Sequence, residues 1–183
     1  MSFILIRTIL WTAALCVLAG ASVVDVRRRI IPNEAVAFVA LSGIALHLVA
    51  RPGGAWVSLA LSLGLFIALA TAAQLALIGG GDAKMIAAVS LLVPPQGLAT
   101  LLLAIALAGG VLSIVYLGLR AWLRARHSRP PSRRGPFRRF LGRERARILA
   151  SRTVPYCIAI FGGVVAYVIS ELPQCSSATS CLL

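Results

Sequence analysis

Residues 55–93 read AWVSLALSLGLFIALATAAQLALIGGGDAKMIAAVSLLV. The first 24 of them, residues 55–78, carry no charge. An apolar run of about 20 residues is long enough to cross a lipid bilayer as a helix. Three glycines then interrupt the run, and a shorter apolar stretch follows at 82–93. This part of the chain predicts a membrane helix, a glycine turn and a short apolar helix that begins with an aspartate.

The rest of the chain is equally apolar. Of its 183 residues, 60% are hydrophobic and 13% are charged, whereas a soluble domain has roughly 25% charged residues. Further apolar runs lie at about 3–24, 34–50, 96–119 and 154–169. We therefore predict an all-α integral membrane protein, a bundle of about six transmembrane helices in which the helix at 82–93 is short. We expect residues 1–183 to form a single polytopic membrane domain.

Basic residues are concentrated in two places. Twelve of the 18 are arginines within 120–152, which contains one acid, and three more are Arg27, Arg28 and Arg29. Such clusters beside membrane helices mark the cytoplasmic side and attract anionic lipids. Four predicted helices separate the two clusters, and because four is even, both clusters can be cytoplasmic. The net charge of +13 is thus expected to serve lipid contact and not nucleic-acid binding.

The same topology places both termini outside the cytoplasm, and in a bacterium they would be periplasmic. Cys175 and Cys181 could then form a disulfide in the C-terminal tail. Cys16 and Cys157 lie inside apolar runs and are expected to be packing residues. No CxxC pair occurs, so neither a thiolate zinc site nor any other metal or cofactor is expected.

Asp25 and Asp82 are the only aspartates in the chain. Each follows a predicted helix at its cytoplasmic end, so the topology places both at one membrane face and at similar depth. Ionisable groups at membrane depth are costly and are often functional. Two neighbouring carboxylates would share one proton, which is the condition for aspartyl proteolysis. One carboxylate then takes a proton from water while the other protonates the scissile carbonyl.

Other roles for the two aspartates stay open on this reasoning. Either could cap a helix. Lys84 could form an ion pair with Asp82. Asp82 could also relay protons in a transporter or channel component. Besides a peptidase and a transporter, a third hypothesis is that the chain is a membrane assembly factor without catalytic activity.

The aspartates lie in two recognisable stretches. Asp25 begins DVRRRIIPN at 25–33, and Asp82 follows the three glycines of GGGDAK at 79–84. The last predicted helix begins with VPYCIAI at 154–160. In sequence, order and spacing these stretches resemble the type IV prepilin peptidases, the bacterial members of the GxGD intramembrane aspartyl proteases. The resemblance covers essentially the whole chain.

The resemblance implies that Asp25 and Asp82 are the catalytic residues. It also implies supporting roles, for the loops or for the substrate, at Gly79, Gly80, Gly81, Lys84, Pro32 and Asn33. The implied substrates are prepilins or pseudopilins with a short basic leader, cut at the cytoplasmic face of the bacterial inner membrane. Larger relatives carry a CxxC region and N-methylate the product, so the resemblance implies a short, peptidase-only member of the Flp/Tad type. Neither the particular pilin nor the oligomeric state follows from it.

Overall fold

The structure is built of helices. The computed structural model describes residues 2–50, 55–125 and 155–175. Within these ranges the chain forms no strand but six α-helices and one 3-10 turn, namely α1 (Ser2–Arg28), α2 (Asn33–Ala50), α3 (Ala55–Gln74), α4 (Gly80–Ser90), η1 (Pro95–Gly97), α5 (Leu98–Ala125) and α7 (Tyr156–Cys175). The all-α fold expected from the sequence is confirmed.

Helix lengths fit a membrane protein. Three segments are long and apolar enough to cross a membrane: Leu5–Arg28, Trp56–Gln74 and Pro95–Trp122. Two shorter apolar stretches, Asn33–Val49 and Tyr156–Glu171, lie in α2 and α7. Helix α4 has 11 residues and rises only about 16 Å, roughly half of a hydrocarbon core. The helix expected to be short is therefore short, and it does not span the core alone.

The chain divides into two compact units. The first comprises residues 1–108 and 155–183, and the second comprises 109–154. Of the second unit, the structure describes the later part of α5. Asp25 and Asp82 both belong to the first unit, and the single domain expected from the sequence stays a prediction.

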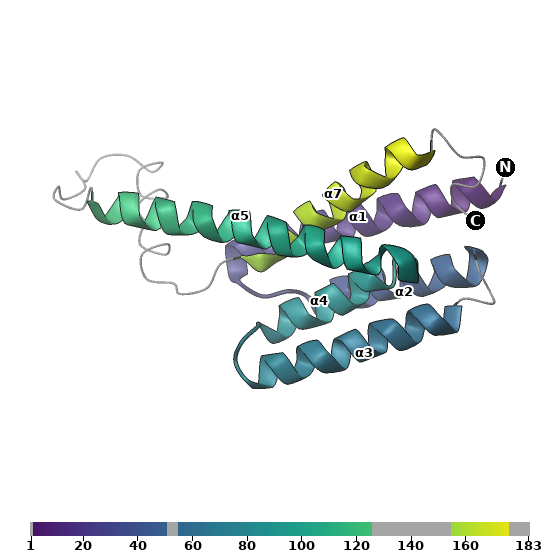
Figure 1. Ribbon diagram of the computed structural model, residues 1–183, viewed down its shortest axis with the longest axis horizontal. Coiled ribbons are helices and arrows are strands. Elements are labelled where there is room, and N and C mark those ends of the chain that lie inside the picture. Colours follow the sequence, from purple (N-terminus) through teal and green to yellow (C-terminus); the bar gives the residue numbers. More distant parts are fainter. Residues whose placement is uncertain (1, 51–54, 126–154, 176–183) are drawn as a thin grey trace. The chain divides into compact units, whose positions relative to one another are not determined.

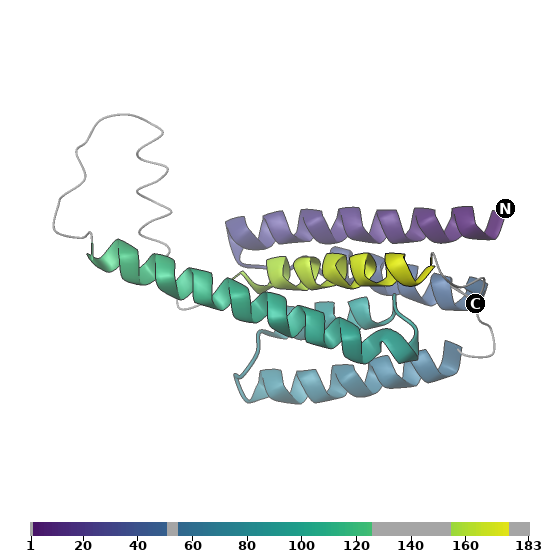
Figure 2. The ribbon, with the colours of Figure 1, turned by 45° about the horizontal axis from the view of Figure 1, so that its top comes forward.

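Helix α4 lies at the centre of the first unit. It packs against α2, α3 and α7, while α1 packs against α2 and α7 (Figures 1 and 2). From Met85 onward every side chain of α4 is buried. They share one core with Leu18 of α1, Val39 of α2 and Ile160 of α7. A helix that is apolar on all sides is typically surrounded by other helices, and the sequence of α4 beyond Lys84 has this character.

Helix α1 extends further than predicted. The sequence prediction ended this helix near Val24 and put Asp25 in a polar turn, but the helix continues to Arg28 and Asp25 lies in its last turn. Arginine is a good helix former, and no glycine or proline occurs between Val24 and Pro32. The helix ends where Arg29 adopts the left-handed conformation, with φ of 58°.

The glycines at 79–81 do not end α3, contrary to the prediction of a helix over 55–78. Helix α3 ends at Gln74, and Ala76 then adopts a left-handed conformation with φ of 57°. This conformation closes helices but costs an alanine about 1–2 kcal/mol. Two of the three glycines form the first turn of α4, which therefore spans 80–90 and not 82–93.

Of the two cysteines expected to be packing residues, one is buried and the other is not. Cys157 is buried as expected, whereas Cys16 is exposed on α1 and does not pack in the core. The disulfide that Cys175 and Cys181 could form lies outside the described side chains. Most of the arginine-rich segment at 120–152 lies outside the described residues as well.

Gly43 allows α2 to approach the backbone that follows α4. A Cβ at Gly43 would lie 2.6 Å from the Cβ of Leu91 and 2.7 Å from its carbonyl carbon. These separations are shorter than van der Waals contact, so Gly43→Ala must push α2 away. We expect it to lower the free energy of unfolding by about 1–3 kcal/mol, the usual cost of overpacking, as measured by denaturant unfolding in detergent micelles.

Gly64→Ala is the matched control, because Gly64 also lies within a helix but a Cβ there would meet no atom within 4 Å. We expect this variant to be as stable as the wild type or slightly more stable. Equal losses in the two variants would contradict the proposed contact.

Candidate active site

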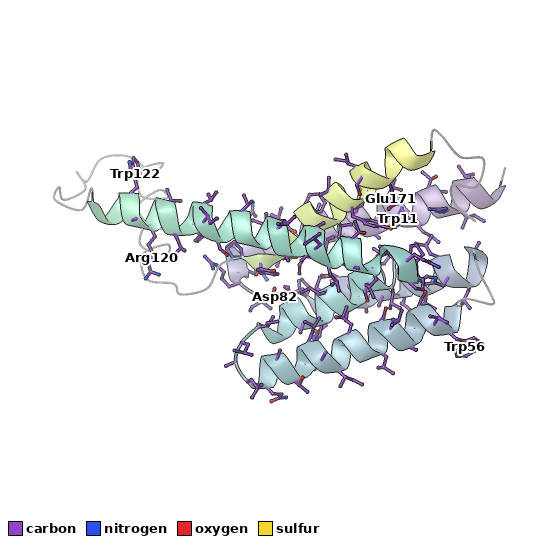
Figure 3. The ribbon with its side chains drawn as sticks, viewed as in Figure 1. Trp11, Trp56, Asp82, Arg120, Trp122 and Glu171 are labelled. Carbon is purple, nitrogen blue, oxygen red and sulfur yellow. The ribbon has the colours of Figure 1, made fainter. Side chains whose placement is uncertain are left out.

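Several helix ends converge at one end of the first unit. In both ribbon views, α1 and α3 end on the side where α2, α4 and α7 begin (Figures 1 and 2). Asp82 lies at this end, whereas Trp56 lies at the opposite end, where α3 begins (Figure 3). A Cβ at Gly81 would lie 3.4 Å from the Cβ of Ile31. The stretches DVRRRIIPN and GGGDAK, far apart in the sequence, are therefore in contact.

Asp25 is buried and faces the first turn of α7. Only 6% of its surface is exposed. Its Oδ2 accepts a hydrogen bond from the backbone N–H of Cys157 at 3.2 Å. The first N–H groups of a helix lack partners within the helix and carry a partial positive charge, so they stabilise a carboxylate. This contact offsets the unfavourable position of Asp25 in the last turn of α1, where the helix dipole disfavours negative charge.

Ser22 contacts the same residue of α7. It precedes Asp25 by three residues, so it lies about one turn away on the same face of α1. Its Oγ is 3.1 Å from the carbonyl oxygen of Cys157 and 2.9 Å from the carbonyl oxygen of Leu18. The hydroxyl proton can be donated to either acceptor. The backbone N–H of Cys157 thus donates to Asp25, and the carbonyl oxygen of Cys157 lies within hydrogen-bond distance of Ser22.

Asp82 lies in the first turn of α4, beside Gly79. Gly79 is the N-cap residue, and no side chain caps this helix. Asp82 therefore does not cap α4, which removes one of the alternative roles. Asp82 is half-buried, and a Cβ at Gly79 would lie 2.7 Å from its Oδ2. Glycine at position 79 thus leaves the space that the Asp82 carboxylate occupies.

The other predicted site residues surround this end of the unit. Gly80, Lys84 and Asn33 are exposed, and a Cβ at Gly80 would meet no atom within 4 Å. Pro32 is half-buried, and its carbonyl accepts the N–H of Val36 at 3.3 Å, which starts α2. As far as the described residues go, Lys84 forms no ion pair with Asp82, so that alternative role is not realised.

The two aspartates are close enough to interact electrostatically. The charge of Asp25 acts on Asp82, and the charges of both act on Cys157. The charge of Asp82 also reaches Tyr156, which begins α7. Two like charges in a partly dry site disfavour double ionisation, which makes it easier for one member of such a pair to carry a proton. The arrangement can therefore present one carboxylate and one carboxylic acid to a reacting group.

That pair of groups suits general acid–base chemistry on a carbonyl, in which water is the nucleophile. Within the described ranges, no group of three histidine, cysteine, aspartate or glutamate side chains gathers to hold a metal ion.

Two residues of this site are not identifiable from the motifs that contain the aspartates. Ser22 lies inside an apolar run, and its alignment with Asp25 depends on α1 continuing past Val24. Cys157 is separated from Asp25 by 132 residues. The one sequence signal for Cys157 is the stretch VPYCIAI, which resembles the start of the last helix in the prepilin peptidases.

Comparison with known proteins gave one match. A protein-family model described as the type IV leader peptidase family matches residues 12–114. The matched region is more than half of the 183 residues and includes both Asp25 and Asp82. No curated protein and no solved structure matches the chain.

Proposed function

We propose, from the premise that this chain belongs to the type IV leader peptidase family, that it is a membrane aspartic endopeptidase whose catalytic pair is Asp25 and Asp82. The family gives a leader peptidase function in general. The two residue roles are our step beyond it. The observation that carries this step is that the stretches holding the only two aspartates, 57 positions apart in the sequence, are in contact, since a Cβ at Gly81 would lie 3.4 Å from the Cβ of Ile31.

In the proposed reaction Asp25 is the base. Its carboxylate is held by the N–H of Cys157, and such a donor favours the ionised form. Asp25 removes a proton from water as the water oxygen bonds to the scissile carbonyl carbon, and Asp82 donates the shared proton to the carbonyl oxygen. Asp25 then gives its proton to the leaving nitrogen as the C–N bond breaks, and Asp82 recovers its proton from the tetrahedral intermediate.

The proposed substrates are prepilins or pseudopilins, of the Flp type, whose short leader precedes an apolar helix. The open backbone at Gly80 leaves room for an extended substrate segment to approach Asp82. Arg27 and Arg28 are exposed beside the site and would repel a basic leader. We therefore assign the arginine clusters to anionic lipid. We propose that this end of the protein lies at the cytoplasmic face of a bacterial inner membrane, with periplasmic termini.

Co-expression with a small pilin precursor tests the proposed function. We expect the mass of the membrane-inserted precursor to fall by that of the leader, and the new N-terminus to carry no methyl group. An uncleaved precursor beside normal amounts of inserted protein would contradict peptidase activity. A proton-coupled transporter would instead show uptake by membrane vesicles that Asp82→Asn abolishes, with precursor processing absent.

A further inference from the structure

We propose that Ser22 is a positioning residue for Asp25, because its hydroxyl fixes the orientation of Cys157 and thereby aims the Cys157 N–H at the Asp25 carboxylate. This inference rests on the proposed function, in which Asp25 is the base. It assigns to the first turn of α7 a role in holding the catalytic pair.

Two side chains of α1 contact the backbone of Cys157 in α7. Helix α1 presents Ser22 and Asp25 one turn apart on a single face, and α1 packs against α7. Asp25 Oδ2 lies 3.2 Å from the Cys157 nitrogen, and Ser22 Oγ lies 3.1 Å from the Cys157 oxygen. Both polar backbone groups of Cys157 therefore lie within hydrogen-bond distance of side chains of α1.

Burial makes these contacts consequential. Ser22 is 7% exposed and Cys157 is fully buried. A buried hydrogen bond is stronger than an exposed one, because no water competes for the donor and the acceptor. The Ser22 hydroxyl therefore resists movement of α7 away from Asp25.

The ordinary alternative is that Ser22 only satisfies its own hydroxyl on α1. Serines in membrane helices commonly bond to the carbonyl four residues earlier, and Ser22 does so with Leu18 at 2.9 Å. Ser42 of α2 has the same bond, to Phe38 at 2.8 Å, and is equally buried. Ser42 has no acceptor from a second helix among the described residues, so it provides a matched control for the loss of a buried hydroxyl.

Purified full-length protein in lipid vesicles, with a pilin precursor as substrate, tests the inference. We expect Ser22→Ala to lower kcat about fivefold with KM unchanged, which corresponds to a hydrogen bond worth about 1 kcal/mol. Ser22→Thr keeps the hydroxyl and should restore most of the rate. Ser42→Ala should leave kcat unchanged. Equal kcat values for Ser22→Ala and the wild type, or a Ser22→Thr variant as slow as Ser22→Ala, would overturn the inference.

A double-mutant cycle on unfolding tests the same coupling without cleavage. Ser22→Ala should lower the melting temperature more in the wild type than in an Asp25→Ala background, which lacks the acceptor for the Cys157 N–H, because both residues act on Cys157. Equal drops in the two backgrounds would overturn the inference. A wild-type protein that leaves the precursor intact would overturn the proposed function and, with it, the positioning role of Ser22 in cleavage. Wild-type cleavage with an uncoupled cycle would overturn the role of Ser22 alone.

Discussion

Gly79→Ala is expected to reduce the rate of precursor cleavage by about 10- to 100-fold while the protein remains folded. The added Cβ would lie 2.7 Å from Oδ2 of Asp82, so the carboxylate must move. A displacement of about 1 Å in a catalytic group can cost roughly a hundredfold in rate. Gly79 itself has φ of −67° and ψ of 135°, which an alanine adopts without strain. The melting temperature should therefore stay close to that of the wild type.

The neighbouring glycine supplies the comparison. Gly80→Ala adds the same methyl group one residue later, where it meets no atom within 4 Å. We expect it to lose less activity than Gly79→Ala when initial rates are measured in the same vesicles. Equal losses at both positions would mean that any added methyl group in the glycine turn lowers the rate, which would contradict a specific effect on Asp82. A fully active Gly79→Ala variant would contradict the placement of the Asp82 carboxylate beside Gly79.

The helices could be predicted from the sequence because few backbone structures are stable inside a membrane. A backbone in hydrocarbon must satisfy its own hydrogen bonds, so a long uncharged run such as 55–78 is expected to be largely helical. The short central helix was also predictable, since glycines precede it and Pro94 follows it closely. These features depend on composition and length, which are read directly from the chain.

The helix ends could not be predicted as well. Arg29 and Ala76 end α1 and α3 by adopting left-handed conformations that their residue types disfavour. A propensity rule favours glycine at such positions and therefore predicts that α3 ends at the glycines. The error at α1 mattered, because a helix that ends at Val24 leaves Asp25 out of register with Ser22.

The position of the two aspartates at one end of the helices could be predicted, but the contact of Asp25 with Cys157 could not. Asp25 and Asp82 are the only aspartates in a chain with five acids, and the topology put them at one end. The contact between Asp25 and Cys157 joins residues 132 positions apart and depends on how α7 packs against α1. No local pattern encodes a backbone donor of this kind.

Asp25→Asn and Asp82→Asn are each expected to lower kcat by about 10²- to 10⁴-fold, the usual contribution of a general acid or base. Asparagine is nearly the same size as aspartate, and its amide oxygen can still accept the Cys157 N–H, so α7 should stay in place. It cannot take up or release the proton that the pair must pass to the substrate. Both variants should therefore reach the membrane in normal amounts without processing the precursor.

Glu34→Gln is the matched control, because Glu34 is an exposed carboxylate in the first turn of α2 at the same end of the unit. The most direct measurement is the rate at which purified wild type, Asp25→Asn, Asp82→Asn and Glu34→Gln cleave a pilin precursor in lipid vesicles. We predict one cut by the wild type and by Glu34→Gln, and background rates for both aspartate variants. Cleavage at the wild-type rate by either aspartate variant would contradict a catalytic pair formed by Asp25 and Asp82.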